Sequence, residues 1–536
     1  VTCYILAASG AMWSLLLIWA TTSGGGFAEK CEKIVDNKTC ILGEGTCHLD
    51  WPGELVIPDK RQMVCPSVAL TADRFVMKSD SNIYTTSTIK INARTMTFNN
   101  SILTSNSTFL RENEHCEGIQ VVNSGFFVKR KLVMKCQDGT VNVTGNTILQ
   151  AAFNVSLRAK FVSFPDFYVK LMGRRINLSA EQLHLRASIT GTPDLVAMAQ
   201  YEASLGWLGG TWTLGSLVAA AETLSFAMDH RVEVLGTSCD NQELPRRRDY
   251  CQELLHSWPW SEQTLGAALT WVDGLKFTSV IFASKEMHMK PRTRFVSASA
   301  LFCAGEELNL ENASSILSQG KGCSAGEGDG AGEVRTHFEL CGGGGASNLG
   351  AGGDGALRVE GEKALMHCAA KGFITEWDGL SLPLTGASGG GCSSGLRPQL
   401  QSSSLAFSAG GGLLWLSTPK LYLNASSRVK ADGLQGTMVG KSAKLAMATG
   451  GGAGGQILIF TEDIRVEECM DEDCEPPELS AEGGDAHCSS AQNTVGGAGG
   501  GGFIGLWWLG GAPTAHEDLG QLVKLQVAGG TLTKTC

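Results

Sequence analysis

Basic charge is scarce in this sequence. Its 43 lysine and arginine residues are outnumbered by 53 aspartate and glutamate residues, so the formal net charge at pH 7 is −10. Nucleic-acid binding needs a basic face that neutralises phosphates. The one compact basic cluster, residues 246–248, is interpreted most simply as a solvated loop. The composition therefore predicts that nucleic acid is not a partner.

The motifs of common active sites are also missing. The sequence contains no GxSxG, HExxH or protein-kinase set, and no histidines at the spacing of zinc ligands. Its glycine runs lack the Lys-Ser/Thr pair of a phosphate-binding loop, since Gln456 follows Gly455. No Gly-X-Y period occurs, which excludes collagen. We therefore expect no catalytic residue and no resident cofactor.

Long apolar runs occur only near the N-terminus. From Met12 the sequence reads MWSLLLIWATTSGGGFA, an apolar core followed by small residues, which is typical of a secretory signal peptide cleaved before Glu29. An uncleaved signal anchor is the alternative. No later run approaches the roughly 20 apolar residues of a membrane-spanning helix. We expect an extracellular or cell-surface location, with membrane contact only if this segment is retained.

Cysteine, by contrast, is abundant. The chain has 18 cysteines, and disulfides are the default for so many in an exported chain. Cys116 and Cys136 form one pair close in sequence, and a bond between Cys239 and Cys251 is expected to pinch a loop, while the full connectivity stays open. The candidate disulfide cysteines are Cys31, Cys40, Cys47, Cys65, Cys116, Cys136, Cys239, Cys251, Cys469 and Cys474.

Acceptor sites for N-glycosylation are frequent as well. One N-x-S/T tripeptide carries little information, but eight of them beside a signal-like start predict a eukaryotic secreted or surface glycoprotein. The acceptor residues are Asn37, Asn99, Asn106, Asn142, Asn154, Asn177, Asn312 and Asn424.

A ten-residue pattern recurs along the chain: apolar, x, apolar, x, small, x, x, apolar, x, apolar. Alternate residues of a strand share a face, so the apolar positions point inward, and the small residue marks a tight bend between two short strands. Copies at Val68 and Ile89 begin 21 residues apart. Repetition at this interval predicts an all-β fold of stacked β-solenoid coils of roughly 21 residues, stabilised by disulfides. The copies begin at Val68, Ile89, Val155, Ile176, Leu217, Leu301, Leu357, Leu414 and Ile457, with a looser one at Ile119.

Glycine is the most unusual component. The chain has 68 glycines, crowded into its second half, and the runs end directly at apolar strands, as in GGGAGGQILIF at residues 450–460. A flexible linker is one interpretation. We favour a crowded turn that only glycine forms, with glycine stacked over glycine in successive coils.

Glycine runs that feed into strands such as QILIF, together with the repeat, resemble the right-handed parallel β-helix (pectin-lyase-like) class. More narrowly, the chain is similar to the very large glycine-rich surface proteins of plants, algae and protists. The resemblance covers roughly residues 67–536 and implies an adhesin-like or wall-associated protein. It carries no catalytic residue across, because the NTD, DD, HG and RIK blocks of the β-helix enzymes are absent.

The pattern divides the chain into five parts. A polar, partly helical insertion separates glycine-poor coils from glycine-rich ones, which we expect to continue beyond the sequence. The expected parts are a signal peptide or anchor at 1–28, a cysteine-rich cap at 29–66, solenoid coils at 67–236, the insertion at 237–290 and glycine-rich coils at 291–536.

Three groups of residues are weak site candidates. The acidic loop ECMDEDCEPPE could supply Asp471 and Asp473 to Ca²⁺, although an acidic run is usually a solvated surface. The cluster of residues 229–231, Asp-His-Arg, is compact, but strand alternation sends its histidine to the opposite face. Trp258 and Trp260 could stack on a sugar, and packing within the insertion is the simpler role.

These observations favour a secreted or surface-attached structural and adhesive glycoprotein without catalysis. Its expected partners are extracellular glycans or surface proteins. A carbohydrate-active β-helix enzyme, either a polysaccharide lyase or a glycoside hydrolase, is the first alternative. A membrane-anchored, receptor-like ectodomain is the second.

Overall fold

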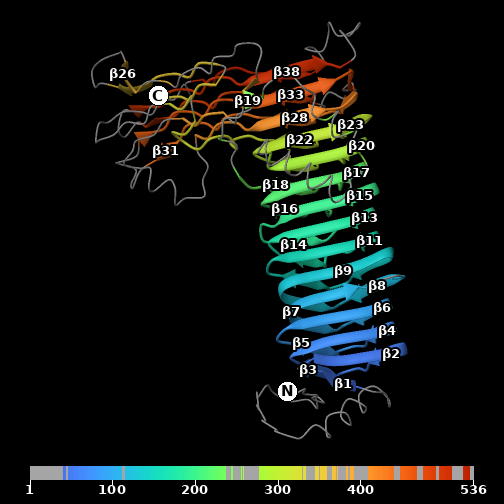
Figure 1. Ribbon diagram of the computed structural model, residues 1–536. Coiled ribbons are helices and arrows are strands. Elements are labelled where there is room, and N and C mark those ends of the chain that lie inside the picture. Colours follow the sequence, from blue (N-terminus) through green and yellow to red (C-terminus); the bar gives the residue numbers. More distant parts are fainter. Residues whose placement is uncertain are drawn as a thin grey trace. The chain divides into compact units, whose positions relative to one another are not determined.

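The computed structural model describes residues 40–43, 46–111, 115–236 and 277–328, isolated residues between 239 and 258, and, with further gaps, parts of 330–531. The chain divides into two units, Val1–Glu222 and Thr223–Cys536. Both contain stacked parallel β-strands (Figure 1). The fold is a parallel β-solenoid, as the repeat predicts, and it is consistent with the pectin-lyase-like class.

Unit 1 consists of long bent strands that alternate with short ones. Its strands are β1 (Cys40–Gly43), β2 (Thr46–Ile57), β3 (Gln62–Cys65), β4 (Ser67–Met77), β5 (Asn82–Thr85), β6 (Thr88–Asn99), β7 (Ile102–Arg111), β8 (Gly118–Val122), β9 (Gly125–Thr144), β10 (Ile148–Ala151), β11 (Asn154–Phe164), β12 (Lys170–Met172), β13 (Arg175–Leu185), β14 (Ser188–Thr190), β15 (Asp194–Leu205) and β16 (Thr211–Leu214); β17 (Ser216–Phe226) crosses the boundary in sequence.

The long strands bend where the pattern places its small residue. In β4 the alternation of buried and outward residues runs from Val68 to Ala72, is interrupted by two exposed residues, and resumes at Phe75. Two consecutive outward residues shift the phase of the alternation. Because of this shift, both halves of the strand turn their apolar side chains into the same core.

Neighbouring coils pair in parallel and in register. Val68 lies opposite Ile89, and Val155 lies opposite Ile176, as predicted. The hydroxyl of Ser67 donates to the carbonyl of Thr88, 21 residues later, at 3.0 Å. In the core, the fully buried rings of Phe75, Phe98 and Phe126 follow one another at centroid distances of 5.6 and 5.1 Å.

The corners after β2, β4, β6, β8 and β9 each contain a residue in the left-handed backbone conformation. Lys60, Asp80, Asn100, Asn123 and Gly145 have positive φ angles, which is uncommon for residues other than glycine. The side-chain amide of Asn100 donates to the carboxylate of Asp80 at 2.9 Å, which links corners of adjacent coils. These corners therefore stack as regularly as the strands.

The solenoid begins before the position predicted from sequence. Residues 46–65 were expected to belong to a cap, but β2 pairs in parallel with β4, with Thr46 opposite Ser67. The bend of β2 contains an extra residue, seen as a register shift between Trp51 and Glu54. That extra residue breaks the ten-residue spacing, so the pattern does not detect this coil.

The loose copy at Ile119 is assigned to the wrong half of a coil. Ile119 lies opposite Met96, in the second half of β6, rather than opposite Ile89. Asn123, which was read as the bend residue, has a φ angle of 48° and occupies the corner instead. A small residue can occupy either the bend or the corner of a coil, so the sequence pattern alone does not distinguish these two positions.

In unit 2 the coils are the same, but long segments separate them. The strands of one face are β20 (Ser279–Met289), β22 (Ser299–Ala304), β23 (Glu307–Leu310), β28 (Leu413–Ser417), β29 (Lys420–Leu423), β33 (Gln456–Thr461), β34 (Asp463–Val466) and β38 (Phe503–Trp508), and those of another are β18 (Arg231–Val234), β21 (Arg294–Val296), β24 (Ser315–Leu317), β30 (Arg428–Lys430), β35 (Glu478–Ser480) and β39 (Lys524–Gln526). Leu414 lies opposite Ile457, so both predicted copies are in register.

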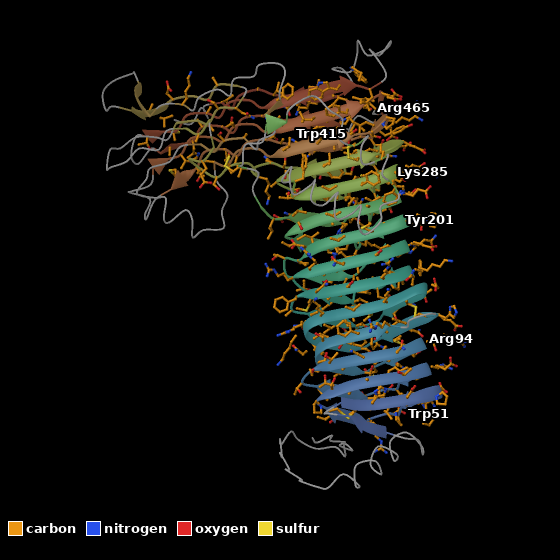
Figure 2. The ribbon with its side chains drawn as sticks, in the orientation of Figure 1. Trp51, Arg94, Tyr201, Lys285, Trp415 and Arg465 are labelled. Carbon is orange, nitrogen blue, oxygen red and sulfur yellow. A yellow bond between two sulfur atoms is a disulfide. The ribbon has the colours of Figure 1, made fainter. Side chains whose placement is uncertain are left out.

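Strands β22, β28 and β33 are buried on both faces. Apolar side chains therefore fill their outward positions as well. The rings of Trp415, Phe460 and Trp507 stack in a column, with centroids 5.0 and 4.8 Å apart and interplanar angles of 14° and 12°. Trp415 lies among the strands in Figure 2.

Two predictions for this half of the chain are wrong. β20 lies within the expected insertion 237–290 but pairs in parallel with β22, so a solenoid coil is already present by residue 279. The copy at Leu357 is not a coil either, because β25 (Gly355–Arg358) pairs antiparallel with β26 (Leu365–Ala369). The apolar residues of this copy alternate as in any strand. The pattern does not specify whether the partner strand is parallel or antiparallel.

The disulfides correct the expected pairing of the insertion. Cys239 is bonded to Cys323 and Cys251 to Cys303, so the predicted Cys239–Cys251 loop does not form. Cys116 is bonded to Cys136, the pair close in sequence. A further bond joins Cys47 and Cys65 within the first described coil.

The glycine runs associate with one another as extended chains. We call this set of segments the glycine bundle: residues 344–348, 350–353, 387–390, 408–412, 431–436, 449–455, 481–484, 496–502 and 528–530. The backbone amides of Gly451 and Gly454 donate to the carbonyls of Gly497 and Gly500, at 2.8 and 2.9 Å. Every third amide of this run therefore donates to the same neighbouring segment. Three residues per turn is the period of the polyproline II helix, in which the backbone has no hydrogen bonds of its own.

The amides of the two residues between Gly451 and Gly454 donate to other segments. Gly452 donates to Leu434 at 2.9 Å, and Ala453 donates to Ser388 at 3.1 Å. The run at 451–455 is therefore surrounded by other backbones, which satisfy its amides while it stays buried.

The glycines are required by the close packing of extended chains against one another, not by turns. Residues 451–455 contain no turn or bend and continue directly into β33, so the predicted crowded turn is wrong. A Cβ atom on Gly452 would collide with the carbonyl oxygen of Ala409, and one on Gly454 with that of Ala481. The expected close approach of backbones is present, but it occurs sideways between extended chains.

Gly452→Ala tests this packing. The added methyl would strike backbone, which cannot rotate away, so we expect the free energy of unfolding to fall by about 1–3 kcal/mol. Gly53→Ala is the matched control, because its new Cβ would meet only ordinary contacts, the nearest at 3.7 Å. Urea unfolding of both variants measures the difference; equal stability would contradict close packing at Gly452.

Candidate functional site

The bend of unit 1 carries a row of paired charges. Arg74 Nε lies 3.4 Å from Glu54 Oε1 on the preceding coil, and Arg94 Nε lies 3.7 Å from Asp73 Oδ1 and 3.3 Å from Glu117 Oε1. These five residues are named the ion-pair ladder. The phase shift at the bend places them on the surface, since both residues after the small one must point outward.

The ladder borders a hollow that we call the polar groove. It has a volume of about 520 Å³ and is lined by side chains of β4, β6, β8 and β9 and their bends. Arg94 projects from the bend of β6, away from the ribbon (Figure 2). Beyond the charges, the polar lining consists of Thr95, Thr97, Gln120, Thr140 and Asn142.

Gly118 deepens the groove. It occupies an outward position of β8 between Thr95 and Thr140, and a Cβ there would approach Thr140 Oγ1 to 3.1 Å. Without that side chain, the lining groups of neighbouring strands remain accessible to a ligand. The groove is not predicted from the sequence, because Gly118 lies outside the glycine-rich runs.

The chemistry of the groove suits a neutral, hydroxyl-rich ligand. Asp73, Arg74, Arg94 and Glu117 contribute two charges of each sign, so the lining is formally neutral in a chain of net charge −10. Hydroxyl, amide and guanidinium groups provide both donors and acceptors. Asp73 and Glu117 both face the guanidinium of Arg94, which makes them an ion-pair network rather than an acid and a base with separate roles.

Unit 2 has a second charged group on strands β30, β35 and β39. The side chain of Glu478 is 11% exposed and lies 2.7 Å from Lys430 Nζ and 3.4 Å from Lys524 Nζ. Burial opposes the charged form of Glu478, but the two lysines outweigh it and lower the pKa of this carboxyl. Glu478 therefore connects three successive coils as an anion.

A carboxyl pair lies next to this group. The buried Asp432 accepts hydrogen bonds from the Ser480 hydroxyl and, at 2.9 Å, from the backbone amide of Glu482. Burial, and then the charge of Asp432, raise the pKa of Glu482. A carboxyl group with a raised pKa beside a charged one is the arrangement that acid–base catalysis uses.

The cluster at residues 229–231 does not form a site. Asp229 lies on a corner and binds Arg292, whose hydrogen bond lowers the pKa of the Asp229 carboxyl. His230 is fully buried, and Arg231 pairs with Glu233 at 3.1 Å. The three side chains thus have separate environments and share no centre.

A sugar-stacking platform in the insertion, the alternative to packing, is not available on Trp258. This ring packs against Phe282 with a centroid distance of 5.2 Å, on the outward face of β20. The nearby Cys251–Cys303 bond attaches the same segment to β22. The structure therefore favours the simpler prediction of packing, while Trp260 lies outside the described residues.

Other predicted residues also lie outside the described part of the chain. The calcium candidates Asp471 and Asp473 belong to this set, as do Cys31, Cys469, Cys474 and Asn37; for Cys40 only the backbone, in β1, is described. Within the described ranges, no three His, Cys, Asp or Glu side chains gather as a metal site would require. No helix among the described residues is long and apolar enough to cross a membrane.

The described glycosylation sequons avoid the core. Asn99 and Asn312 are exposed at corners, and Asn177 occupies an outward position of β13. The remaining acceptors, Asn106, Asn142, Asn154 and Asn424, are half-buried and none is buried. All seven positions are thus compatible with a glycan outside the solenoid, and Asn142 lines the polar groove.

Comparisons of the chain with protein families, curated proteins and solved structures give no match.

Glu478→Gln tests the charged group of unit 2. A carboxyl whose folded pKa is lowered stabilises the fold above its unfolded pKa, and this contribution disappears as the pH falls through the folded pKa. At pH 7 we expect the variant to lose about 1 kcal/mol of unfolding free energy, and we expect the difference from the parent protein to shrink as the pH falls below about 4.3, the ordinary pKa of a glutamate.

The matched control is Glu475→Gln, whose side chain is 66% exposed. Urea unfolding at several pH values measures both variants. A loss for Glu478→Gln that is the same at every acidic pH at which the protein stays folded would contradict the ion-pair explanation.

Proposed function

We propose that the protein is a secreted or cell-surface structural and adhesive glycoprotein, whose solenoid binds extracellular glycans without catalysing a reaction. The observation that carries this proposal is the polar groove, which is neutral, rich in hydroxyl and amide groups, and formed across several coils. A saccharide chain offers many hydroxyl groups in a row, which suits a surface that repeats from coil to coil.

Support for the location comes from the disulfides and the sequons. The four cysteine pairs bonded within the described part of the chain are compatible with an oxidising compartment. The proposed likeness to glycine-rich surface proteins of plants, algae and protists rests on the glycine runs of the sequence. A receptor-like ectodomain retained by residues 1–28 remains the alternative topology, and N-terminal sequencing of the mature protein decides it, since a start at Glu29 establishes cleavage.

Arg94→Ala tests the groove. Arg94 lies at the centre of the ion-pair ladder, and its loss removes one of the two cations from the lining, so we expect saccharide affinity on an array of neutral oligosaccharides to fall about tenfold. Lys90→Ala is the control, because Lys90 is exposed on the same strand before the bend. Unchanged affinity in Arg94→Ala would remove the groove from the proposal.

A carbohydrate-active enzyme, a lyase or a hydrolase, is the second candidate. The observation that favours it is the pair Asp432 and Glu482, of which Glu482 has the raised pKa expected of a proton donor. If this function is right, the protein releases products from pectin or alginate, and Glu482→Gln abolishes the release while Glu462→Gln, at an exposed position, does not. Absence of products at every pH from 4 to 8 would exclude it.

A further inference from the structure

Two long corners flank a short one near the end of unit 1. Five residues join β11 to β12 and five join β15 to β16, whereas only Arg186 and Ala187 join β13 to β14. These coils are consecutive, since β13 pairs with both β11 and β15. The long corners therefore project on either side of the short one.

The projecting corners carry exposed aromatic side chains. Phe167 and Tyr168 are 52% and 60% exposed, although large apolar groups normally avoid water. The rings of Phe167 and Tyr168 are 4.2 Å apart, and Phe167 lies 6.4 Å from Trp207, which comes from the other long corner. These three residues are named the aromatic platform.

The platform is held rigidly. The Asp166 carboxylate accepts a hydrogen bond from the Gly145 amide at 2.8 Å, and the Val169 amide donates to the Asp166 carbonyl at 3.2 Å. Trp207 lies flat over Gly210, where a Cβ atom would collide with the indole. A rigid surface loses little conformational entropy when it binds a ligand.

Polar side chains lie on the corners beside the platform. Lys170 lies opposite Ile148 on one side and Ser188 on the other. Asn146 and Arg186, both exposed, belong to the corners of the two coils adjacent to that of Tyr168. An amide and a guanidinium are therefore available on either side of the coil that carries the ring.

This combination points to a saccharide rather than to a protein. A stable protein interface buries about 800 Å² on each partner, and here a few aromatic side chains are surrounded by exposed charged and polar ones. One face of a sugar ring is apolar and packs on an aromatic ring, while its edge carries hydroxyl groups that pair with donors such as Asn146 and Arg186.

We propose that the aromatic platform is a second saccharide-binding site, which takes the ring of a neutral hexose or pentose on Tyr168 and Phe167. The inference rests on the proposed glycan-binding function and deepens it. It is separate from the polar groove, which lies on the bends and strands of the earlier coils.

The test measures binding of neutral gluco-, xylo-, manno- and galacto-oligosaccharides to the full secreted chain. We expect Tyr168→Ala to weaken binding about tenfold, and Tyr168→Phe, which keeps the ring, to restore most of it. Phe153→Ala is the matched control, since this ring is 54% exposed on a different corner. Saturation-transfer NMR gives the direct readout, with transfer from aromatic protons to the sugar expected in the parent protein and in Tyr168→Phe but strongly reduced in Tyr168→Ala.

The outcomes separate the two sites. If Arg94→Ala abolishes binding while Tyr168→Ala leaves it unchanged, the platform inference fails and the proposed function stands. If the parent protein binds none of these saccharides, both fail. If the parent protein instead forms a dimer in sedimentation that Tyr168→Ala disrupts, the platform is a protein interface and the inference is overturned.

Discussion

The parallel hydrogen bonding of one coil to the next is the interaction on which the rest of the structure depends. It fixes the distance between backbones at about 4.8 Å, and every other feature must fit that distance. In unit 1 the fit is achieved at bends such as that of β4 by a phase shift, where two outward residues in succession let both halves of a strand face one core. The same two residues give the ion-pair ladder its position, so the groove is a consequence of how the coil closes.

The glycine bundle also depends on contacts between backbones, but these contacts differ from those of the sheet. The strands of unit 2 pair at the ordinary distance, but the segments between them run as extended chains whose amides bond in three directions. Such chains approach so closely that side chains are excluded, which accounts for glycine without invoking flexibility. The glycine runs end at strands because the bundle and the sheet are built from the same continuous chains.

The sequence contains enough information to predict the coils but not all of their partners. Apolar spacing at Val68 and Ile89 identifies paired strands, because inward side chains must recur wherever the core continues. It fails at Trp51, where an extra residue in the bend alters the spacing, and at Leu357, where an antiparallel pair satisfies the same alternation. Register and strand direction depend on contacts between distant residues, which a local pattern does not record.

The sites were harder to predict for a related reason. Arg94 and Glu117 are ordinary surface charges in the sequence, and only the stacking of coils brings them together. Tyr168 and Trp207 are separated by the short corner at Arg186, so no local motif joins them. Compact sequence clusters were poor guides in contrast, since alternation and corners separate Asp229, His230 and Arg231.

The register of adjacent coils can be measured directly with a pair of cysteines. Val76 lies opposite Thr97 on the outward face of neighbouring strands. The double variant Val76→Cys/Thr97→Cys is expected to form a cross-link that peptide mapping detects, and Val76→Cys/Asn99→Cys, displaced by two residues, is expected to form none. Equal cross-linking in both, or in neither, would contradict the stacked parallel coils.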